Sequence, residues 1–215
     1  MKNRLFLFAG ILSFVSAFFV VAGLLISYLL TPLPPQDLRA IEAISRTFIF
    51  LFAPILLLPT ILAVYRLLVQ DFPLLALVSL ILGQVGFGGL LIWSFLTAFL
   101  LPADTANYLP VLYVELMLIG LWTLITAAAL LVFESKNLIQ GNRRSFLYGF
   151  LFLSGLVGGI ALILYGWNLL RPLSMPSAAN YSILIWLASY PLWLIGLGAS
   201  LLTYSREPAL LLPGS

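Results

Sequence analysis

The stretch LPVLYVELMLIGLW (residues 109–122) is apolar along its whole length except for one carboxylate, Glu115. Counted on to residue 133, the apolar run has the roughly 20 residues that a helix needs to cross the hydrocarbon core of a bilayer. Backbone N–H and C=O groups in lipid must find their hydrogen-bond partners within the segment, and a helix provides them. This run therefore predicts a transmembrane helix.

Five further stretches have the same character. The six predicted spans cover residues 5–30, 47–69, 74–101, 109–133, 145–170 and 181–204. The segments between them contain most of the charged residues and several prolines and glycines. We predict an all-α, polytopic membrane protein: a six-transmembrane-helix bundle formed as a single membrane domain over residues 1–204, with a short cytoplasmic tail at residues 205–215.

The composition of the chain points to the same class of protein. Of its 215 residues, 63% are hydrophobic and only 8% are charged, whereas a soluble domain carries about 25% charged residues. The 10 Lys and Arg residues against 7 Asp and Glu give a net charge of +3, spread too thinly to form a nucleic-acid-binding face. Most of the surface must face lipid, so we expect membrane lipids, and no nucleic acid, as partners.

The positions of Lys and Arg predict how the bundle is oriented, because cytoplasmic loops are enriched in these residues. One side of the predicted bundle collects seven of them, and the other side collects only Arg39, Arg46 and Arg171. We therefore expect a multi-pass protein of the plasma membrane with its N-terminus and its C-terminus in the cytoplasm.

The chain contains no His and no Cys. Serine–histidine triads, haem held by His, zinc proteases and thiolate nucleophiles all need one of these residues. No cluster of acidic residues replaces them within the spans. We expect no catalytic residues, no metal, no cofactor and no enzyme activity.

Glu115 is the ionisable group that lies deepest within any predicted span. A charge at the centre of a bilayer costs about 2.5–3.5 kcal/mol on insertion scales, so an intramembrane carboxylate needs a partner. Its helical stripe continues through Ile119, Trp122 and Thr126, which predicts an inward face. Candidate partners at similar depth are the cations Arg46 and Arg171 and the hydrogen-bonding groups of Asn168, Tyr165 and Gln84. Two interpretations remain open: a structural ion pair or hydrogen bond, and a site for a proton, an ion or a cationic ligand.

Gln84 lies in the stretch LGQVGFGG (residues 82–89), about ten residues into its predicted span. A buried amide needs hydrogen-bond partners. We expect it to bond to a neighbouring helix, and contact with a ligand or ion is the alternative. The glycines around it do not form a phosphate-binding loop, because no strand precedes them and no Lys follows.

Small residues form stripes on the last two spans. They are Gly155, Gly158 and Gly159 on the fifth span and Gly196 on the sixth. Small residues allow helix backbones to approach closely in membranes. We predict helix packing along these stripes, although the aromatic and hydroxyl residues beside them would also suit the lining of a cavity.

Two apolar motifs, YPLWLIGLGASLL (residues 190–202) and PTILAVYRLL (residues 59–68), resemble stretches of small six-helix bacterial integral membrane proteins grouped as a domain family of unknown function. The resemblance implies the six-helix topology and no catalytic role. Vitamin-binding subunits of energy-coupling-factor transporters are similar in size and helix number, but their coupling motif is not found in the first span.

The sequence favours a non-catalytic membrane protein, either a subunit of a membrane complex or a bundle that binds a small ligand or lipid. The alternative is a small transporter or channel component that uses Glu115 and Gln84. We expect a homo-oligomer, other membrane subunits, or a small hydrophobic or cationic ligand as partners.

Overall fold

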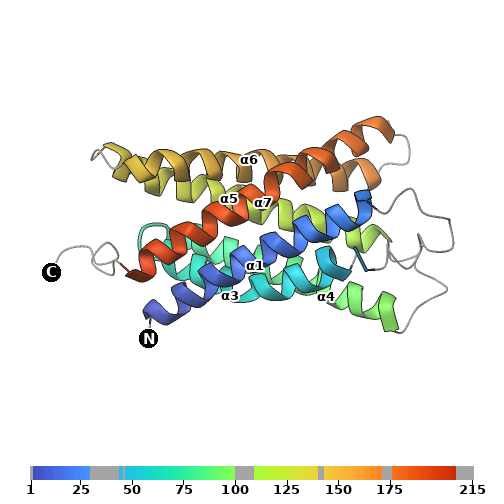
Figure 1. Ribbon diagram of the computed structural model, residues 1–215, viewed down its shortest axis with the longest axis horizontal. Coiled ribbons are helices and arrows are strands. Elements are labelled where there is room, and N and C mark those ends of the chain that lie inside the picture. Colours follow the sequence, from blue (N-terminus) through green and yellow to red (C-terminus); the bar gives the residue numbers. More distant parts are fainter. Residues whose placement is uncertain are drawn as a thin grey trace.

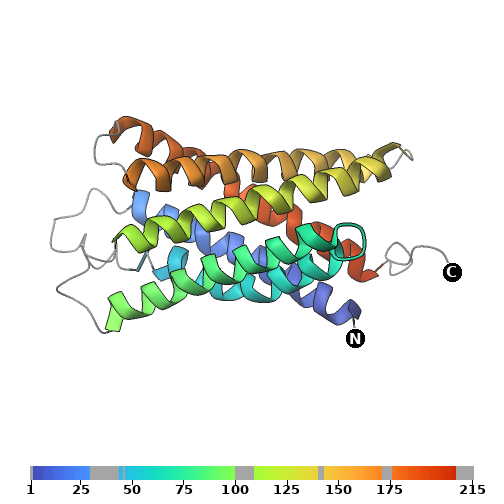
Figure 2. The ribbon, with the colours of Figure 1, turned by 180° about the vertical axis from the view of Figure 1, so that it is seen from behind.

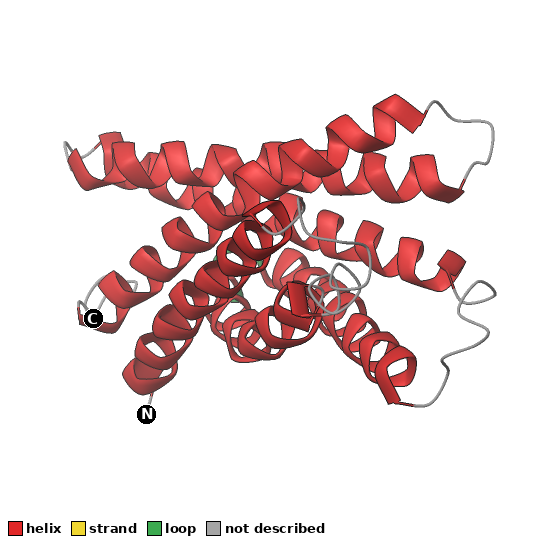
Figure 3. Ribbon diagram, turned by 45° about the vertical axis from the view of Figure 1, so that its right-hand side comes forward, coloured by secondary structure: helices red, strands yellow, loops and turns green. Residues whose placement is uncertain are grey.

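A computed structural model describes residues 2–29, 44–45, 47–99, 109–139, 143–170 and 176–206. The described chain is helical almost throughout, and it contains no strand (Figure 3). Its elements are α1 (Lys2–Leu29), the π-helix η1 (Phe48–Phe52), α3 (Ala53–Leu68), α4 (Pro73–Phe99), α5 (Leu109–Ile139), α6 (Arg143–Leu170) and α7 (Pro176–Arg206).

Each helix packs against the next one along the chain, and α7 returns to pack against α1, so that the six long helices form a closed ring. In Figures 1 and 2, α5 and α6 run along one side of the bundle and α1, α3 and α4 along the other, and α7 crosses obliquely from α6 toward α1. The start of α1 and the end of α7 lie at the same end of the bundle (Figure 1). Which side of a membrane that end faces stays a prediction from the Lys and Arg count.

Six helices are long and apolar enough to cross a membrane, one in each of the six predicted spans. The outer surface of the bundle is rich in large apolar side chains, such as Phe18, Leu74 and Ile92, which are 64–80% exposed. Exposure of such a surface to water is energetically unfavourable, whereas contact with lipid is not. The prediction of an all-helical chain with six apolar helices is confirmed, and these helices fit a multi-pass membrane protein.

Glycines lie where α5, α6 and α7 pack closely against one another. A Cβ added to Gly159 of α6 would lie 2.8 Å from the backbone oxygen of Gly120 on α5, and one added to Gly120 would meet the oxygen of Gly159 at the same distance. Three other glycines lie at similarly close contacts. A Cβ added to Gly155 of α6 would meet Trp193 of α7 and Ala127 of α5, one added to Gly158 of α6 would meet Ser189 of α7, and one added to Gly196 of α7 would meet Leu151 of α6. These contacts leave no room for larger residues.

Candidate functional site

Glu115 lies on α5, six residues after its first residue Leu109, or about 9 Å along the helix at 1.5 Å per residue. Its side chain is 8% exposed. A Cβ added to Gly89 of α4 would lie 2.5 Å from its Oε1 atom. The carboxylate therefore lies inside the bundle, at the contact between α4 and α5, in a space that exists because residue 89 is a glycine.

One oxygen of this carboxylate has no partner in the described part of the chain. The Oε2 atom of Glu115 is buried and accepts no hydrogen bond there. Arg46 and Arg171, the two predicted cationic partners, lie outside the described residues. An ion pair with either of them therefore stays a prediction.

Two of the other predicted partners belong to α6, which packs on the opposite side of α5. An added Cβ at Gly166 of α6 would lie 2.7 Å from the backbone oxygen of Tyr113 and 2.6 Å from Met117. At 100° per residue, Met117 points about 200° away from Glu115 around the helix axis. Tyr165 and Asn168 flank this α6 contact, and both have interactions of their own.

Gln84 is exposed on the outer face of α4. Its amide therefore points away from the interior where Glu115 lies, and the expected hydrogen bond to a neighbouring helix stays a prediction. The reason for this orientation is the pattern of glycines around it: added Cβ atoms at Gly83 and Gly86 would collide with Trp122 and Ile119 of α5. These glycines fix the inward face of α4 and turn the intervening Gln84 outward.

A small cavity is lined by residues of η1 and of the five helices α3 to α7. Its volume of about 20 Å³ is enough for about one water molecule. The adjacent α5 residues Leu116 and Ile119 line it, although Glu115 itself does not. The other lining residues come from every remaining element except α1: Ile49, Phe50, Ala53, Pro54, Leu57, Phe87, Leu90, Leu162, Trp186 and Tyr190.

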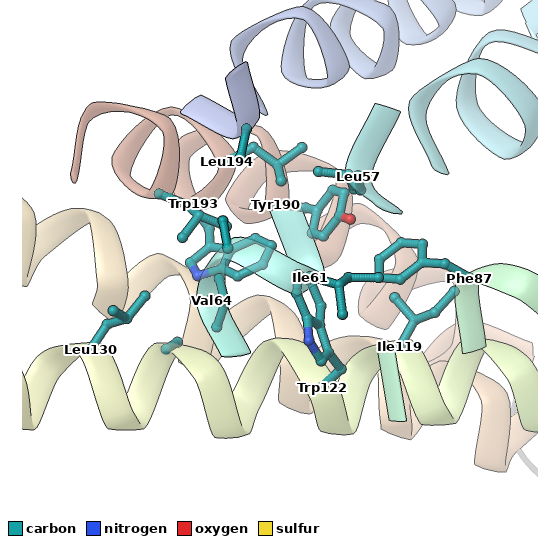
Figure 4. Close-up of a cluster of buried hydrophobic side chains, with 14 of the residues drawn as sticks. Leu57, Ile61, Val64, Phe87, Ile119, Trp122, Leu130, Tyr190, Trp193 and Leu194 are labelled. Carbon is teal, nitrogen blue, oxygen red and sulfur yellow. The ribbon is translucent and has the colours of Figure 1, made fainter. Parts of the chain in front are cut away.

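Aromatic rings form one wall of this cavity and extend from it into the core. Trp186 stacks on Tyr190 with ring centroids 4.9 Å apart, and Trp193 lies 5.6 Å from Tyr190. Trp122 makes edge-to-face contacts with Trp193 at 5.1 Å and with Phe87 at 5.2 Å. Figure 4 shows Tyr190, Phe87 and Ile119 gathered in the same part of the core. We call these five residues (Phe87, Trp122, Trp186, Tyr190 and Trp193) the aromatic cluster.

The indole N–H groups of this cluster have no hydrogen-bond acceptor among the described residues. The Nε1 atoms of Trp122, Trp186 and Trp193 are buried and make no hydrogen bond in the described part of the chain. Buried polar groups are hydrogen-bonded in the great majority of cases. Trp186, which carries one of these unpaired donors, lines the cavity, and Glu115, which carries an unpaired acceptor, directly precedes the lining residue Leu116.

Another part of the lining is the irregular start of the second span. In η1 the N–H of Ala53 donates to the oxygen of Phe48, five residues back, in place of the usual four. Pro54 has no N–H to offer Phe50, and the hydroxyl of Ser94 on α4 donates to the Phe50 oxygen at 3.1 Å. Single π-turns of this kind are frequent at functional sites. Nothing in the sequence pattern revealed it, apart from the proline.

No family model, no curated protein and no solved structure matches the chain. Among the described residues, no three acidic, His or Cys side chains are grouped as a metal site would require. The local geometry around Glu115 and the cavity is therefore the basis for a functional proposal.

Proposed function

We propose that this chain is a non-catalytic, ligand-binding helical bundle of the membrane, and that its ligand is a small hydrophobic molecule with a cationic amine. The observation that carries the proposal is the buried Oε2 atom of Glu115, which has no partner in the described chain. Its residue directly precedes Leu116, which lines the cavity. A carboxylate inside a membrane favours a partner that brings positive charge and hydrogen-bond donors.

The walls of the cavity support the same chemical class. Phe50, Phe87, Trp186 and Tyr190 present aromatic rings, and the faces of such rings attract cations. The remaining lining residues are aliphatic or Pro54, which suits a hydrophobic body. A ligand larger than one water molecule must widen the cavity. We expect it to widen at η1 and Pro54, where the regular backbone hydrogen bonds of an α-helix are interrupted.

Binding of hexylammonium to the full chain in detergent tests this proposal, with hexan-1-ol as the neutral control ligand. Hexylammonium should raise the unfolding temperature of the wild type, because a ligand that binds only the folded state stabilises it. Glu115→Gln should weaken hexylammonium binding by about 10- to 100-fold, the equivalent of one charge-assisted hydrogen bond. It should leave hexan-1-ol binding and the unliganded stability nearly unchanged.

Asp71→Asn is the matched control, because Asp71 is an exposed carboxylate at the turn between α3 and α4. This variant should bind hexylammonium as the wild type does. Equal binding by Glu115→Gln and the wild type would contradict the proposal. If Glu115→Gln changes nothing but Glu115→Leu lowers the stability, the carboxylate has a structural role and pairs with a group outside the described residues.

Transport of the same ligand is a second candidate function, and the π-turn favours it. A wall built from η1 and followed by Pro54 is suited to local rearrangement. Uptake of hexane-1,6-diammonium, a doubly charged analogue of hexylammonium that crosses bare bilayers slowly, should then be faster into proteoliposomes that contain the wild type than into those with Glu115→Gln. Equal uptake rates for the wild type and Glu115→Gln would contradict transport and leave ligand binding as the function.

A further inference from the structure

The outer face of α4 carries an amide in the middle of the membrane. Gln84 is the twelfth residue of the 24-residue span Pro73–Leu96, and it is exposed. Around it, Leu77, Ile81 and Val85 are apolar and about half exposed. The side-chain amide of Gln84 makes no hydrogen bond to another described residue. Acyl chains at this depth offer neither donors nor acceptors, so contact with lipid alone leaves the amide unpaired.

The residues on this face are spaced as in a coiled-coil seam. Alternating steps of four and three residues connect Leu77, Ile81, Gln84, Gly88, Leu91 and Phe95, which we call the α4 seam. A repeat of this kind keeps one face of a helix turned toward a partner helix over several turns. Leu77, Ile81 and Phe95 are 48–53% exposed.

Gly88 makes a notch in the seam, one helical turn from Gln84. A Cβ added there would meet nothing within 4 Å, whereas almost all the other described glycines press against a neighbouring helix. Gly88 is therefore not required for packing within this chain. A glycine on the outer face of a membrane helix allows the backbone of a second helix to approach closely.

We infer that the α4 seam is the contact surface of a symmetric dimer, in which the seam of a second copy packs against it. All copies of a membrane protein share one orientation in the bilayer, so a two-fold axis along the membrane normal places identical residues at identical depth. Gln84 then meets Gln84 of the other copy. An amide has both donors and an acceptor, so each side chain donates to the other, and both are satisfied at the depth where lipid provides nothing.

This inference does not rest on ligand binding, since the seam lies on the outer face of the bundle and Glu115 lies inside it. Energy transfer between labelled copies of the full chain in lipid vesicles measures dimerisation without any ligand. Gln84→Leu should lower the association constant about tenfold, as expected for the loss of interhelical hydrogen bonds in a membrane. Gly88→Leu should lower it as well, through steric clash, with no loss of monomer stability.

Disulfide formation locates the contact face, because the natural chain has no Cys and single cysteines can be introduced. Ile81→Cys and Gly88→Cys keep Gln84 in place and should cross-link on oxidation. Val78→Cys, on an exposed position of α4 beside the seam, and Ile160→Cys, on the exposed face of α6, should cross-link much less. Three results would overturn the inference: a monomer in vesicles, a dimer that survives both Gln84→Leu and Gly88→Leu, or cross-linking that is strongest at residue 160.

Discussion

Where α1 meets α3, hydroxyl groups extend from one helix to the other. The hydroxyls of Ser13 and Thr60 lie 3.1 Å apart, and both also reach the backbone oxygen of Ala9 on α1, Thr60 from the other helix at 3.2 Å and Ser13 from the same helix at 2.9 Å. One turn further along α1, the hydroxyl of Ser16 donates to the backbone oxygen of Ala53 at 3.1 Å. This contact is made of hydrogen bonds between helices.

Where α5 meets α6, in contrast, the backbones themselves touch at Gly120 and Gly159. Hydroxyl groups are present on α5, but they bond within their own helix. Thr123 donates to the oxygen of Ile119 at 2.9 Å, and Thr126 donates to that of Trp122 at 2.7 Å. This contact is made of close packing.

The difference shows two ways to hold helices together when lipid removes the hydrophobic drive between them. Interhelical hydrogen bonds act through specific atom pairs, so the loss of one pair leaves the surrounding packing in place. A glycine contact depends on close approach of the two backbones, which any larger residue would prevent. We therefore expect substitutions to have larger effects at the α5–α6 contact than at the α1–α3 contact.

Gly159→Ala should give the larger effect. The added methyl group would lie 2.8 Å from both the Gly120 oxygen and the Leu124 nitrogen, and these backbone atoms can move only if the helices separate. Overpacking of this kind costs about 1–3 kcal/mol of unfolding free energy. Reversible unfolding of the chain in lipid–detergent bicelles measures this loss.

Gly149→Ala is the matched control on the same helix, because its added methyl group would approach only Leu131, at 4.0 Å. Alanine favours helix over glycine by up to about 1 kcal/mol, so this variant should be as stable as the wild type or slightly more stable. Similar losses in both variants would show that α6 does not depend on its close contact with α5.

The fold could be predicted from the sequence because it depends on length and hydropathy, which are local properties. Each apolar run that is long enough to cross a membrane forms one helix, as Leu109–Val132 does within α5. The depth of Glu115 along its span also follows directly from its position in the sequence. Its burial against α4 does not, because it depends on which face of α5 the neighbouring helix covers.

The orientation of α4 could not be predicted from the sequence. Gln84 lies between glycines, and a polar residue near mid-membrane is normally turned inward. In the structure Gly83 and Gly86 take the inward face, since α5 approaches α4 there. The sequence contained these glycines, but it did not show which helix they contact. The cavity wall at η1 was also missed, because π-turns leave no hydrophobic periodicity.

Thr60→Val tests the other side of the comparison, with a smaller expected effect. Valine has nearly the shape of threonine, so the change removes the hydrogen bonds to Ser13 and Ala9 while the packing around the buried side chain persists. Interhelical hydrogen bonds of this kind contribute about 1 kcal/mol. Thr126→Val, the matched control, removes hydrogen bonds only within α5 and should cost less.

A double-mutant cycle of Ser13→Ala and Thr60→Val isolates the hydroxyl pair from the other contacts of each residue. If the two hydroxyls bond directly, the double variant should be more stable than the sum of the single losses predicts, by a few tenths to about 1 kcal/mol. The remaining loss from Thr60→Val then belongs to its bond with the Ala9 oxygen. Two results would contradict this: stability losses that are strictly additive, or a loss from Thr126→Val as large as that from Thr60→Val. Either result would mean that packing, and not hydrogen bonding, holds α1 against α3. The α1–α3 and α5–α6 contacts would then be of the same kind.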